Sequence, residues 1–386
     1  MTIKELDKTY IANTYARADL LIVSGKGSLV YDENGKEYID MGAGIAVSGL
    51  GISDEAWKEA VIAQLGSVSH TSNLYYTSPQ AKLAQALCER GGMKKVFFSN
   101  SGAEANEGAI KAARKYSSDK YGPGRHVIIT LNDSFHGRTI TTLSATGQEH
   151  FHHDFNPFTE GFVHVEPNDL PAMEKAMADP AVCAVLIEIV QGEGGINVLD
   201  KGYVQAIAKL AKSKDILLMV DEIQTGNGRT GALFSYMLYD VQPDVATTAK
   251  GLGGGLPIGA VLFGEKTQDV LSLGSHGSTF GGNPICAAGA LNVISRIDDA
   301  LMAEVTKKSE YIKAQFKDAP GVVEVTGLGL MLGIKTVKPV GDVLAQCMER
   351  GVIVLSAKDK VRLLPALNIG WPELEKAVSI LREVVA

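Results

Sequence analysis

The amino-acid sequence predicts a mainly parallel α/β fold divided into two domains. Short apolar runs are bounded by polar or glycine residues and separated by helix-like stretches, which is typical of parallel strands buried on both faces of a sheet. The 42 glycines gather at the turns between these runs, and no repeat or low-complexity tract is present. The length of 386 residues exceeds the roughly 250–300 at which a single hydrophobic core stops growing, so a second domain is expected.

The order of the runs gives the expected domain limits. Residues 1–59 begin the chain and are expected to pack with the C-terminal domain; within them, a hairpin is predicted over 27–40 with its turn at Asn34-Gly35. Residues 60–275 form the predicted large domain, because they carry the apolar runs and the glycine-rich turns. Beyond Gly282 a long helical segment through Asp299 precedes four strand-like pieces, which indicates a smaller α+β domain over 276–386. The expected strands lie at 96–98, 127–129, 184–187, 216–220 and 245–249, then at 322–325, 330–334, 352–355 and 361–364.

Charge and cysteine content exclude several classes of protein. Lys and Arg number 37 against 44 Asp and Glu, so no basic field exists to attract nucleic acid. The N-terminal residues mix charges of both signs, unlike a secretory or transit peptide, and the apolar stretch 181–190 is too short to span a bilayer. The cysteines stand singly at 88, 183, 286 and 347, which fits a reducing compartment. A cytoplasmic protein without a membrane or nucleic-acid partner is therefore expected.

Ligands of such sheets bind beyond the carboxyl ends of the strands, so the residues that follow each strand are the candidates for chemistry. The strand at 96–98 leads into Ser99–Asn106 and an Ala- and Lys-rich helix. Ser101 and Glu104 have the spacing of a capping box, and small residues beside them leave free N–H groups at the positive end of the helix dipole. The segment predicts either a phosphate site or simply a well-capped helix.

The strand at 216–220 ends in Asp221-Glu222, which allows three interpretations. An acid at this position resembles the magnesium ligand of a P-loop ATPase, but the sequence contains no G-x-x-x-x-G-K-[ST] motif. Residues 226–231 match G-x-G-x-x-G and suggest a nicotinamide-dependent dehydrogenase, yet they start several residues after the strand and lack the acid expected about 20 residues further on. The third interpretation, in which Asp221 contacts a cofactor that is bound by a lysine, requires such a lysine at a neighbouring strand end.

Lys250 is a lysine in such a position, because it follows the strand-like run 245–249 and precedes a glycine-rich turn. Pyridoxal phosphate chemistry requires a lysine that binds the cofactor, a carboxylate for the pyridine nitrogen and a cradle for the phosphate. Lys250, Asp221 and residues 101–103 supply all three. An ionised Asp221 keeps the ring nitrogen protonated, so that the ring can accept electrons. Taken singly, Lys250 could also be an ordinary solvated loop lysine.

Seven ordered segments resemble the class III, fold-type I aminotransferases, which use pyridoxal phosphate, and within them the enzymes that act on N-acetylornithine. The segments are 99–106, 135–138, 191–195, 221–226, 249–255, 277–284 and 362–365. The resemblance implies a large domain with a mainly parallel seven-stranded sheet. It also implies transfer of the ω-amino group of N-acetylornithine to 2-oxoglutarate, giving N-acetylglutamate semialdehyde and glutamate in arginine biosynthesis.

By this resemblance Lys250 is the lysine that binds the cofactor and carries the proton, and Asp221 is the partner of the pyridine nitrogen. Gln224 would contact the phenolic oxygen and Phe135 would stack on the ring. Thr279, beside Ser278, would reach the phosphate or substrate of a neighbouring subunit, which implies a homodimer. The full set of implied cofactor-binding residues is Ser101, Gly102, Ala103, Phe135, Asp221, Glu222, Ile223, Gln224, Lys250 and Thr279.

Two arginines are implied as the carboxylate anchors, since a bidentate arginine best fixes a carboxylate. Arg138 is similar to the residue for the α-carboxylate of acetylornithine and the distal carboxylate of 2-oxoglutarate, and Arg362 to the residue for the α-carboxylate of 2-oxoglutarate. Glu193 would pair with Arg362 in the first half-reaction and release it in the second. Tyr15 and Ser278 are the other implied substrate contacts.

Several alternatives stay open at this stage. Ornithine, N-succinylornithine, 4-aminobutyrate and N-acyl diaminopimelate or lysine derivatives share the ω-amine of the donor. The sequence departs from the usual family pattern at Ile52, Ala103, Ile189 and Ala366, away from the expected chemical residues. His150, His152 and His153 lie close together in a polar stretch, but their spacing does not provide the third strong ligand that a zinc site needs. No metal site is therefore expected.

Overall fold

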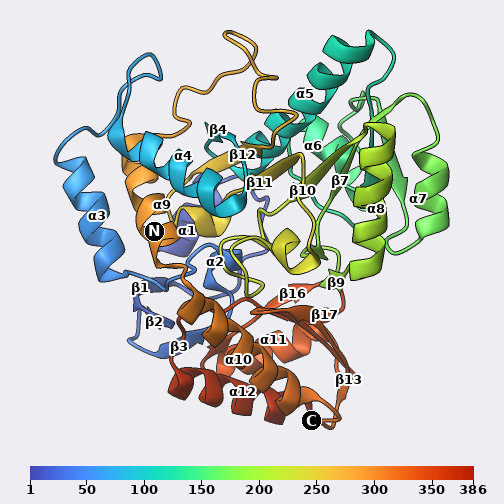
Figure 1. Cartoon of the computed structure of the whole chain (residues 1–386). Helices are drawn as coiled ribbons and strands as arrows, with labels where there is room; N and C mark the ends of the chain where they lie inside the picture. Colours follow the sequence, from blue (N-terminus) through green and yellow to red (C-terminus); the bar gives the residue numbers. More distant parts are fainter.

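A seven-stranded sheet forms the centre of the protein, for which a computed structural model describes residues 1–386 (Figure 1). Its strand order is β4 (Lys95–Ser99), β12 (Gly259–Phe263), β11 (Val245–Thr248), β10 (Leu217–Asp221), β7 (Val182–Ile187), β5 (Val127–Leu131) and β6 (Phe162–Val165). Only β12 runs antiparallel to its neighbours, so the predicted mainly parallel sheet is confirmed. All the strands except β12 therefore direct their carboxyl ends to one edge.

Both faces of this sheet are covered, which explains why its strands are nearly continuous apolar runs. Leu217 and Met219 of β10 lie in one apolar cluster with alanines of helix α5 (Gly102–Tyr121), whereas Leu218 and Val220 lie in the other cluster with residues of the helices at 78–91 and 201–214. Successive side chains of a strand point to opposite faces, so each face needs its own apolar residues. The other helices and short elements here are α4 (Ser78–Gly91), α6 (Ile140–Ala145), α7 (Leu170–Ala176), α8 (Lys201–Lys214), α9 (Pro284–Arg296), β8 (Val190–Gln191) and β9 (Asn197–Val198).

Strands from the N-terminal part of the chain meet the C-terminal part in a second region, at the bottom of Figure 1. Strands β1 (Ile22–Lys26), β2 (Leu29–Asp32) and β3 (Glu37–Asp40) form a sheet whose fourth strand is β15 (Val352–Ile353) from the C-terminal part. Beside it lie β13 (Val322–Leu328), β14 (Met331–Thr336), β17 (Lys360–Leu363) and β16 (Leu355–Ala357). The helices of the two termini are α1 (Ile3–Tyr10), α2 (Ala43–Ala46), α3 (Glu55–Leu65), α10 (Asp299–Phe316), α11 (Val340–Glu349) and α12 (Trp371–Val385).

The opening hairpin forms as the sequence predicts, with β2 and β3 paired antiparallel. Gly35 has a φ of +79°, a conformation that glycine adopts without strain. Ile39 and Met41 share one buried core with Phe316, Leu332 and other residues of the C-terminal part. Residues 39–41 thus pack with the C-terminal part, whereas the packing of the whole segment 1–59 and the domain limits at 59 and 275 stay predictions.

The structure adds elements that the sequence did not suggest. β6 and β12 were not among the expected strands: the run of β6 is short and contains His164, and β12 follows a proline within a glycine-rich stretch. The expected long helical segment beyond Gly282 divides into α9 and α10. Asp298 causes the division, since its carboxylate accepts a hydrogen bond from Leu301 N–H at 2.8 Å and starts a new helix.

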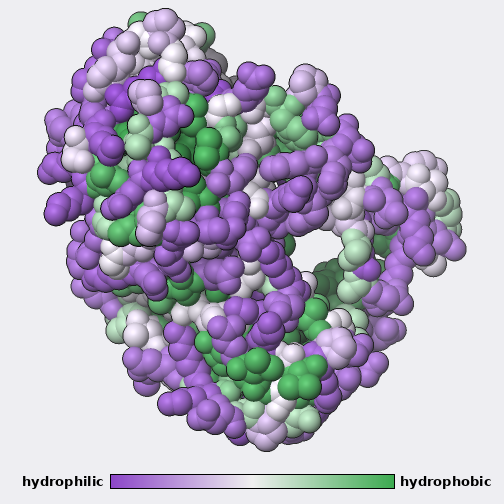
Figure 2. Space-filling model, turned by 90° about the vertical axis from the view of Figure 1, so that its right-hand side faces the viewer, coloured by the Kyte–Doolittle hydropathy of each residue, from purple (hydrophilic) through white to green (hydrophobic).

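The surface agrees with the acidic, charge-rich composition. Hydrophilic side chains cover most of the face drawn in Figure 2, and apolar side chains gather in separate patches. None of the helices combines the length and apolar character that crossing a bilayer requires.

Candidate active site

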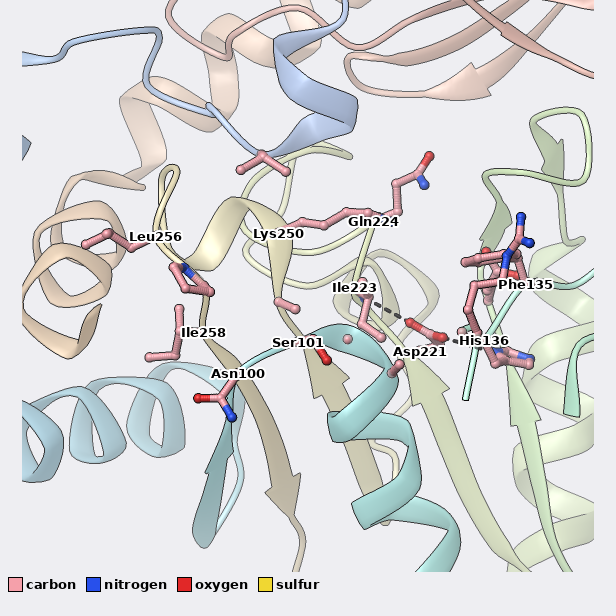
Figure 3. A pocket seen from close by; sticks show the side chains of 18 of the residues that line it. Asn100, Ser101, Phe135, His136, Asp221, Ile223, Gln224, Lys250, Leu256 and Ile258 are labelled. Carbon is pink, nitrogen blue, oxygen red and sulfur yellow. Dashed lines mark hydrogen bonds and ion pairs between the residues drawn. The ribbon is translucent and has the colours of Figure 1, made fainter. Parts of the chain in front are cut away.

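A cavity of about 440 Å³ opens where β10 and β11 end and α5 begins (Figure 3). Parallel strands bring their carboxyl ends to one edge, so residues distant in sequence meet there. The cavity brings together nine of the predicted site residues: Ser101, Gly102, Ala103, Phe135, Arg138, Asp221, Ile223, Gln224 and Lys250. Asn100, His136, Glu188 and the segment Leu256–Ile258 also line it.

The N-terminus of α5 forms one wall of the cavity. Ser101 caps the helix, and its hydroxyl accepts a hydrogen bond from Glu104 N–H at 3.2 Å. The predicted capping box is only half formed, because the Glu104 carboxylate accepts from Asn100 N–H instead of Ser101 N–H. The first N–H groups of a helix have no intrahelical partner and lie at the positive end of its dipole, so Gly102 and Ala103 offer an anion site.

Gly102 is required by a close approach. A Cβ atom at this position would lie 2.8 Å from Cγ2 of Ile223, which itself lines the cavity. We expect Gly102→Ala to push Ile223 into the cavity and to raise the dissociation constant of the pyridoxal phosphate that the sequence predicts here roughly 5- to 100-fold, the range for an overpacked site. Titration of the apoenzyme measures this.

The matched control is Gly202→Ala, in the first turn of α8, where a Cβ would meet nothing within 4 Å. This control should bind the cofactor as the wild type does. Unchanged affinity in Gly102→Ala would contradict the role of the close approach.

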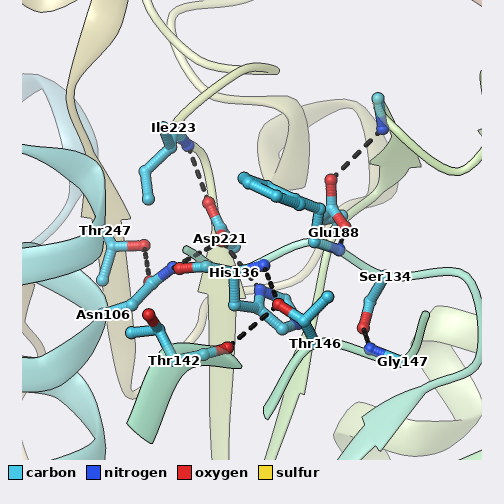
Figure 4. A network of polar contacts seen from close by, with 12 residues as sticks. Asn106, Ser134, His136, Thr142, Thr146, Gly147, Glu188, Asp221, Ile223 and Thr247 are labelled. Carbon is cyan, nitrogen blue, oxygen red and sulfur yellow. Dashed lines mark hydrogen bonds and ion pairs between the residues drawn. The ribbon is translucent and has the colours of Figure 1, made fainter. Parts of the chain in front are cut away.

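Asp221 lies at the end of β10 with only 3% of its surface exposed. Its carboxylate accepts three hydrogen bonds: from Ile223 N–H at 3.0 Å, from Nδ1 of His136 at 2.8 Å and from Nδ2 of Asn106 at 2.8 Å (Figure 4). Three donors on one carboxylate fix its orientation. Asp221 is therefore a buried carboxylate held rigidly at the cavity.

Lys250 follows β11 directly and begins a single 3₁₀ turn, Lys250–Leu252. Its φ of +45° lies in the left-handed region, which is uncommon for a residue with a long side chain and is frequent at functional sites. Figure 3 shows its side chain extending into the cavity. Burial lowers the pKa of the Lys250 amine, although the carboxylates of Glu193 and Asp221 act in the opposite direction. A larger share of neutral amine is thus available as a nucleophile or base than for an exposed lysine.

Arg138 is exposed at the rim of the cavity. Its guanidinium carbon lies 3.9 Å from the ring centroid of Phe151 and 5.5 Å from that of Phe135. The two aromatic rings orient the cation without neutralising it. Arg138 is not part of any ion pair in the structure, so its positive charge is available to an anionic ligand.

A second arginine lies beyond Gln224. Nη1 of Arg362 donates to Oε1 of Glu193 at 2.6 Å and to Oε1 of Gln224 at 3.3 Å, while Nε2 of Gln224 donates to Glu193 at 3.1 Å. Arg362 is 4% exposed, and its Nε is buried without a partner. Gly192 permits this packing, since a Cβ there would lie 2.3 Å from Oε1 of Gln224.

The Glu193 carboxylate is held in its charged form by this cluster. Burial alone would raise its pKa, but the charge of Arg362 and the hydrogen bonds from Arg362 and Gln224 lower it overall. Its side chain keeps 29% of its surface exposed, whereas that of Arg362 keeps 4%. The acid is therefore the more accessible partner of the pair.

Besides Glu193 and Arg362, four predicted residues are not among those that line the cavity. Glu222 points away from it, and its carboxylate accepts hydrogen bonds from Ser235, Tyr236 and Thr225. The prediction of Glu222 as a cofactor ligand is corrected by this: neighbouring residues at the strand end point in opposite directions, and Asp221 takes the cavity side. Tyr15 is 70% exposed, and Ser278 and Thr279 lie on a loop that meets the cavity only where the Ser278 hydroxyl accepts from Asn100.

Sequence reasoning missed three buried residues that support the site. Asn106 donates to Asp221 and accepts from Thr247, and Glu188 accepts hydrogen bonds from the N–H groups of Phe135 and Gly192. Burial raises the pKa of Glu188 to about 7. A signal for Glu188 existed, since it is the single charge in the apolar stretch 181–190. No local signal marks Asn106 or Thr247, because their partners lie far away in the sequence.

The chain matches known proteins over its whole length. Residues 10–385 match the family described as aminotransferase class-III. The chain is a class III aminotransferase. It is 50% identical over 386 residues to the acetylornithine aminotransferase of Haemophilus ducreyi, covering 100% of this chain and 98% of that relative.

Solved structures of aminotransferases have the same fold as this one. The N-acetylornithine aminotransferase of Stenotrophomonas maltophilia is 36% identical and superposes with a TM-score of 0.86. The match covers 99% of this chain and 98% of the Stenotrophomonas chain. The ornithine aminotransferase of Toxoplasma gondii, at 32% identity, has a TM-score of 0.94 over 99% of this chain and 93% of its own, and its structure contains pyridoxal phosphate at partial occupancy in the active site. The predicted family and the fold-type I class are confirmed.

The cofactor of this aminotransferase is pyridoxal phosphate, and the residues present fit it. The buried carboxylate of Asp221 suits a protonated ring nitrogen, the start of α5 suits a phosphate, and Lys250 suits a covalent bond to the aldehyde carbon. The dehydrogenase interpretation is wrong. Residues 226–230 of the loop are buried, and Asn227 and Arg229 donate hydrogen bonds to carbonyl groups of neighbouring backbone, so the loop leaves no room for a dinucleotide.

Proposed function

We propose that this aminotransferase moves the ω-amino group of N-acetylornithine to 2-oxoglutarate, producing N-acetylglutamate semialdehyde and glutamate in arginine biosynthesis. The observation that carries the proposal is that two arginines, Arg138 and Arg362, lie near the cavity that contains Lys250. Arg138 is free, whereas Arg362 is paired with Glu193. A site of this kind suits two substrates that both carry an amine or carbonyl group and differ in their number of carboxylates. The name of the relative with 50% identity supports N-acetylornithine as the donor.

The roles of the chain's own residues follow from their positions. Pyridoxal phosphate, when bound, supplies an electron sink for the carbanion formed at the reacting carbon of the substrate. Lys250 would bind the cofactor covalently, and its amine, once released, would move the proton at the reacting carbon, a role that its lowered pKa suits. Asp221 would pair with the protonated ring nitrogen, Gln224 would contact the phenolic oxygen, and Phe135 would pack against the ring.

The carboxylates of the substrates are bound by the two arginines. Arg138 binds the α-carboxylate of the donor or the distal carboxylate of 2-oxoglutarate. Glu193 neutralises Arg362 while the donor is bound, and moves away when 2-oxoglutarate or glutamate brings a second carboxylate. The buried Nε of Arg362, which lacks an acceptor, would then gain one.

Single half-reactions test the donor. The yellow absorption band of the lysine-bound cofactor is followed after adding N-acetylornithine, ornithine or 4-aminobutyrate without a keto acid. We expect N-acetylornithine to bleach the band fastest and 2-oxoglutarate to restore it. Faster bleaching by another amine would replace the donor and keep the chemistry, and the absence of a yellow band after reconstitution would reject the role of Lys250.

Arg362→Met tests the selection of substrates. We expect the glutamate half-reaction to slow by about 100-fold or more, because a carboxylate loses its buried charged partner, and the N-acetylornithine half-reaction to slow far less. Glu193→Gln should act in the opposite sense: it frees Arg362, so the half-reaction with glutamate is kept or accelerated relative to that with N-acetylornithine. Equal losses in both half-reactions of Arg362→Met would contradict the assignment.

We also propose a cytoplasmic homodimer that shares its active sites. Large apolar side chains are exposed on two segments near Thr279: Leu74 and Tyr76 are 87% and 106% exposed, and Leu273 and Phe280 are 104% and 58% exposed. Nδ2 of Asn73 donates to the carbonyls of Ser278 and Gly281, so these segments lie side by side. Burial of such a patch against a second copy would bring Thr279 and Ser278 to the partner's cavity. The four free cysteines fit a reducing compartment.

A further inference from the structure

The side chain of Asn106 is buried at a point where four parts of the active site meet (Figure 4). Its Nδ2 donates to Oδ2 of Asp221 at 2.8 Å and to the carbonyl oxygen of His136 at 2.7 Å, and its Oδ1 accepts from the hydroxyl of Thr247 at 2.8 Å. Asn106 is 0% exposed and Thr247 is 1% exposed. Every strong hydrogen-bonding position of the amide except one lone pair is thereby used.

These contacts join the segments that carry the site. His136 belongs to the loop of Phe135 and Arg138, Thr247 lies three residues before Lys250, and Asp221 ends β10. Asn106 itself lies four residues after Gly102, so both residues occupy one face of α5. A single carboxamide therefore links the phosphate end of the cavity with the carboxylate, the aromatic wall and the strand that leads to the lysine.

The orientation of the amide is determined by its neighbours. The Asp221 carboxylate and the carbonyl oxygen of His136 only accept hydrogen bonds, so Nδ2 must face them. A rotation by 180° would direct Oδ1 at these two oxygen atoms and lose both hydrogen bonds. The hydroxyl of Thr247 donates to Oδ1 on the other side and so holds the amide in the orientation that gives Asp221 a donor.

An asparagine in this position is unfavourable for the helix itself. It lies within α5, where alanine has the higher helix propensity, and burying an amide costs free energy unless all its groups are bonded. Apolar residues fill the neighbouring positions Ala105 and Ala109. A polar residue here is explained by the charge that it contacts.

We propose that Asn106, held in place by Thr247, is a positioning residue for Asp221, and that it acts on the cofactor's ring nitrogen by keeping the Asp221 carboxylate aligned with it. The proposal rests on the role of Asp221 given under the proposed function. It predicts that variants of Asn106 lose affinity for cofactors that contain the ring nitrogen. A merely structural role would weaken the binding of any cofactor analogue.

The test compares two ligands in each variant: pyridoxal phosphate and its analogue with CH in place of the ring nitrogen. Dissociation constants are measured by titrating apoenzyme, without any turnover. We expect Asn106→Ala to weaken the binding of pyridoxal phosphate about tenfold or more, because a buried charge loses a donor, and to change the binding of the analogue far less. Ser117→Ala, which alters another buried polar side chain of α5, should change neither.

Thr247 provides a second variant if Asn106→Ala does not fold. Thr247→Val keeps the volume and removes the hydroxyl, so we expect the same nitrogen-specific loss at a smaller size, and Thr247→Ser should restore wild-type binding. Equal losses for the two ligands in Asn106→Ala or Thr247→Val would overturn the proposal. Failure of the wild type to prefer pyridoxal phosphate over the analogue would instead reject the role of Asp221, and the proposal with it.

Discussion

Lys250→Ala should abolish turnover, with a fall in kcat of at least about 10⁴-fold, the upper range for one proton-transferring group. The variant loses both the covalent bond to the cofactor and the group that moves the proton. No other lysine lines the cavity, so none can take its place. The rate is measured with N-acetylornithine and 2-oxoglutarate, and the absorption spectrum reports the missing covalent bond.

Two further variants separate this effect from a loss of charge or stability. Lys250→Arg keeps a positive charge but has no amine that can be deprotonated, so it should be as inactive as the alanine variant. Lys266→Ala removes a half-exposed lysine that pairs with Asp215 and Asp244, and it should retain turnover. Appreciable turnover in Lys250→Ala would exclude this residue from the chemistry.

Asp221→Asn is expected to have the next largest effect, a fall in kcat of about 10²–10³-fold, the range for removing one preorganised electrostatic partner. The substitution keeps the shape of the side chain and removes the charge. The new amide would also direct an N–H at the donors of His136 or Asn106, which now face a carboxylate. Steady-state rates and the affinity for pyridoxal phosphate are measured together.

Asp215→Asn is the control, because it removes the charge of a partly buried aspartate outside the cavity. Asp215 has its pKa lowered to about 2, where burial opposes the shift and the hydrogen bonds and charge of Lys120 produce it. A lowered pKa contributes stability above the unfolded value near 3.8, and this stability is lost as the pH falls toward 2. Asp215→Asn should thus alter stability and leave kcat unchanged; an Asp221→Asn variant with the same behaviour would reject its role at the ring nitrogen.

Much of the framework was predictable because it depends on local signals. The apolar runs that became β5, β7 and β10 must be buried on both faces, and this requirement is visible in every residue of the run. Lys250 and Asp221 were found because each follows such a run directly. Their meeting at one edge is then a consequence of parallel strands, and needs no knowledge of side-chain contacts.

The rest of the site depends on contacts between distant residues. Glu222 and Asp221 are adjacent acids in the sequence. Only the directions of their side chains show that Asp221 lines the cavity and that Glu222 bonds to Ser235, Tyr236 and Thr225. Gln224 was expected to serve the cofactor alone, whereas its amide also contacts both members of the Glu193–Arg362 pair. Asn106 looks like one polar residue of a helix until Asp221, 115 positions away, is found beside it.

The antiparallel strand β12 has a consequence for the apoenzyme. Thr248 of β11 pairs with Ala260 of β12, so the residues between them form a short loop whose two ends are held together by the sheet. The entropy lost on closing a loop grows with its length, and here the closure is already provided by strand pairing. The lysine therefore stays near its working position before any cofactor arrives, and the amide hydrogens of β11 and β12 should exchange slowly with solvent in the apoenzyme as well as in the holoenzyme.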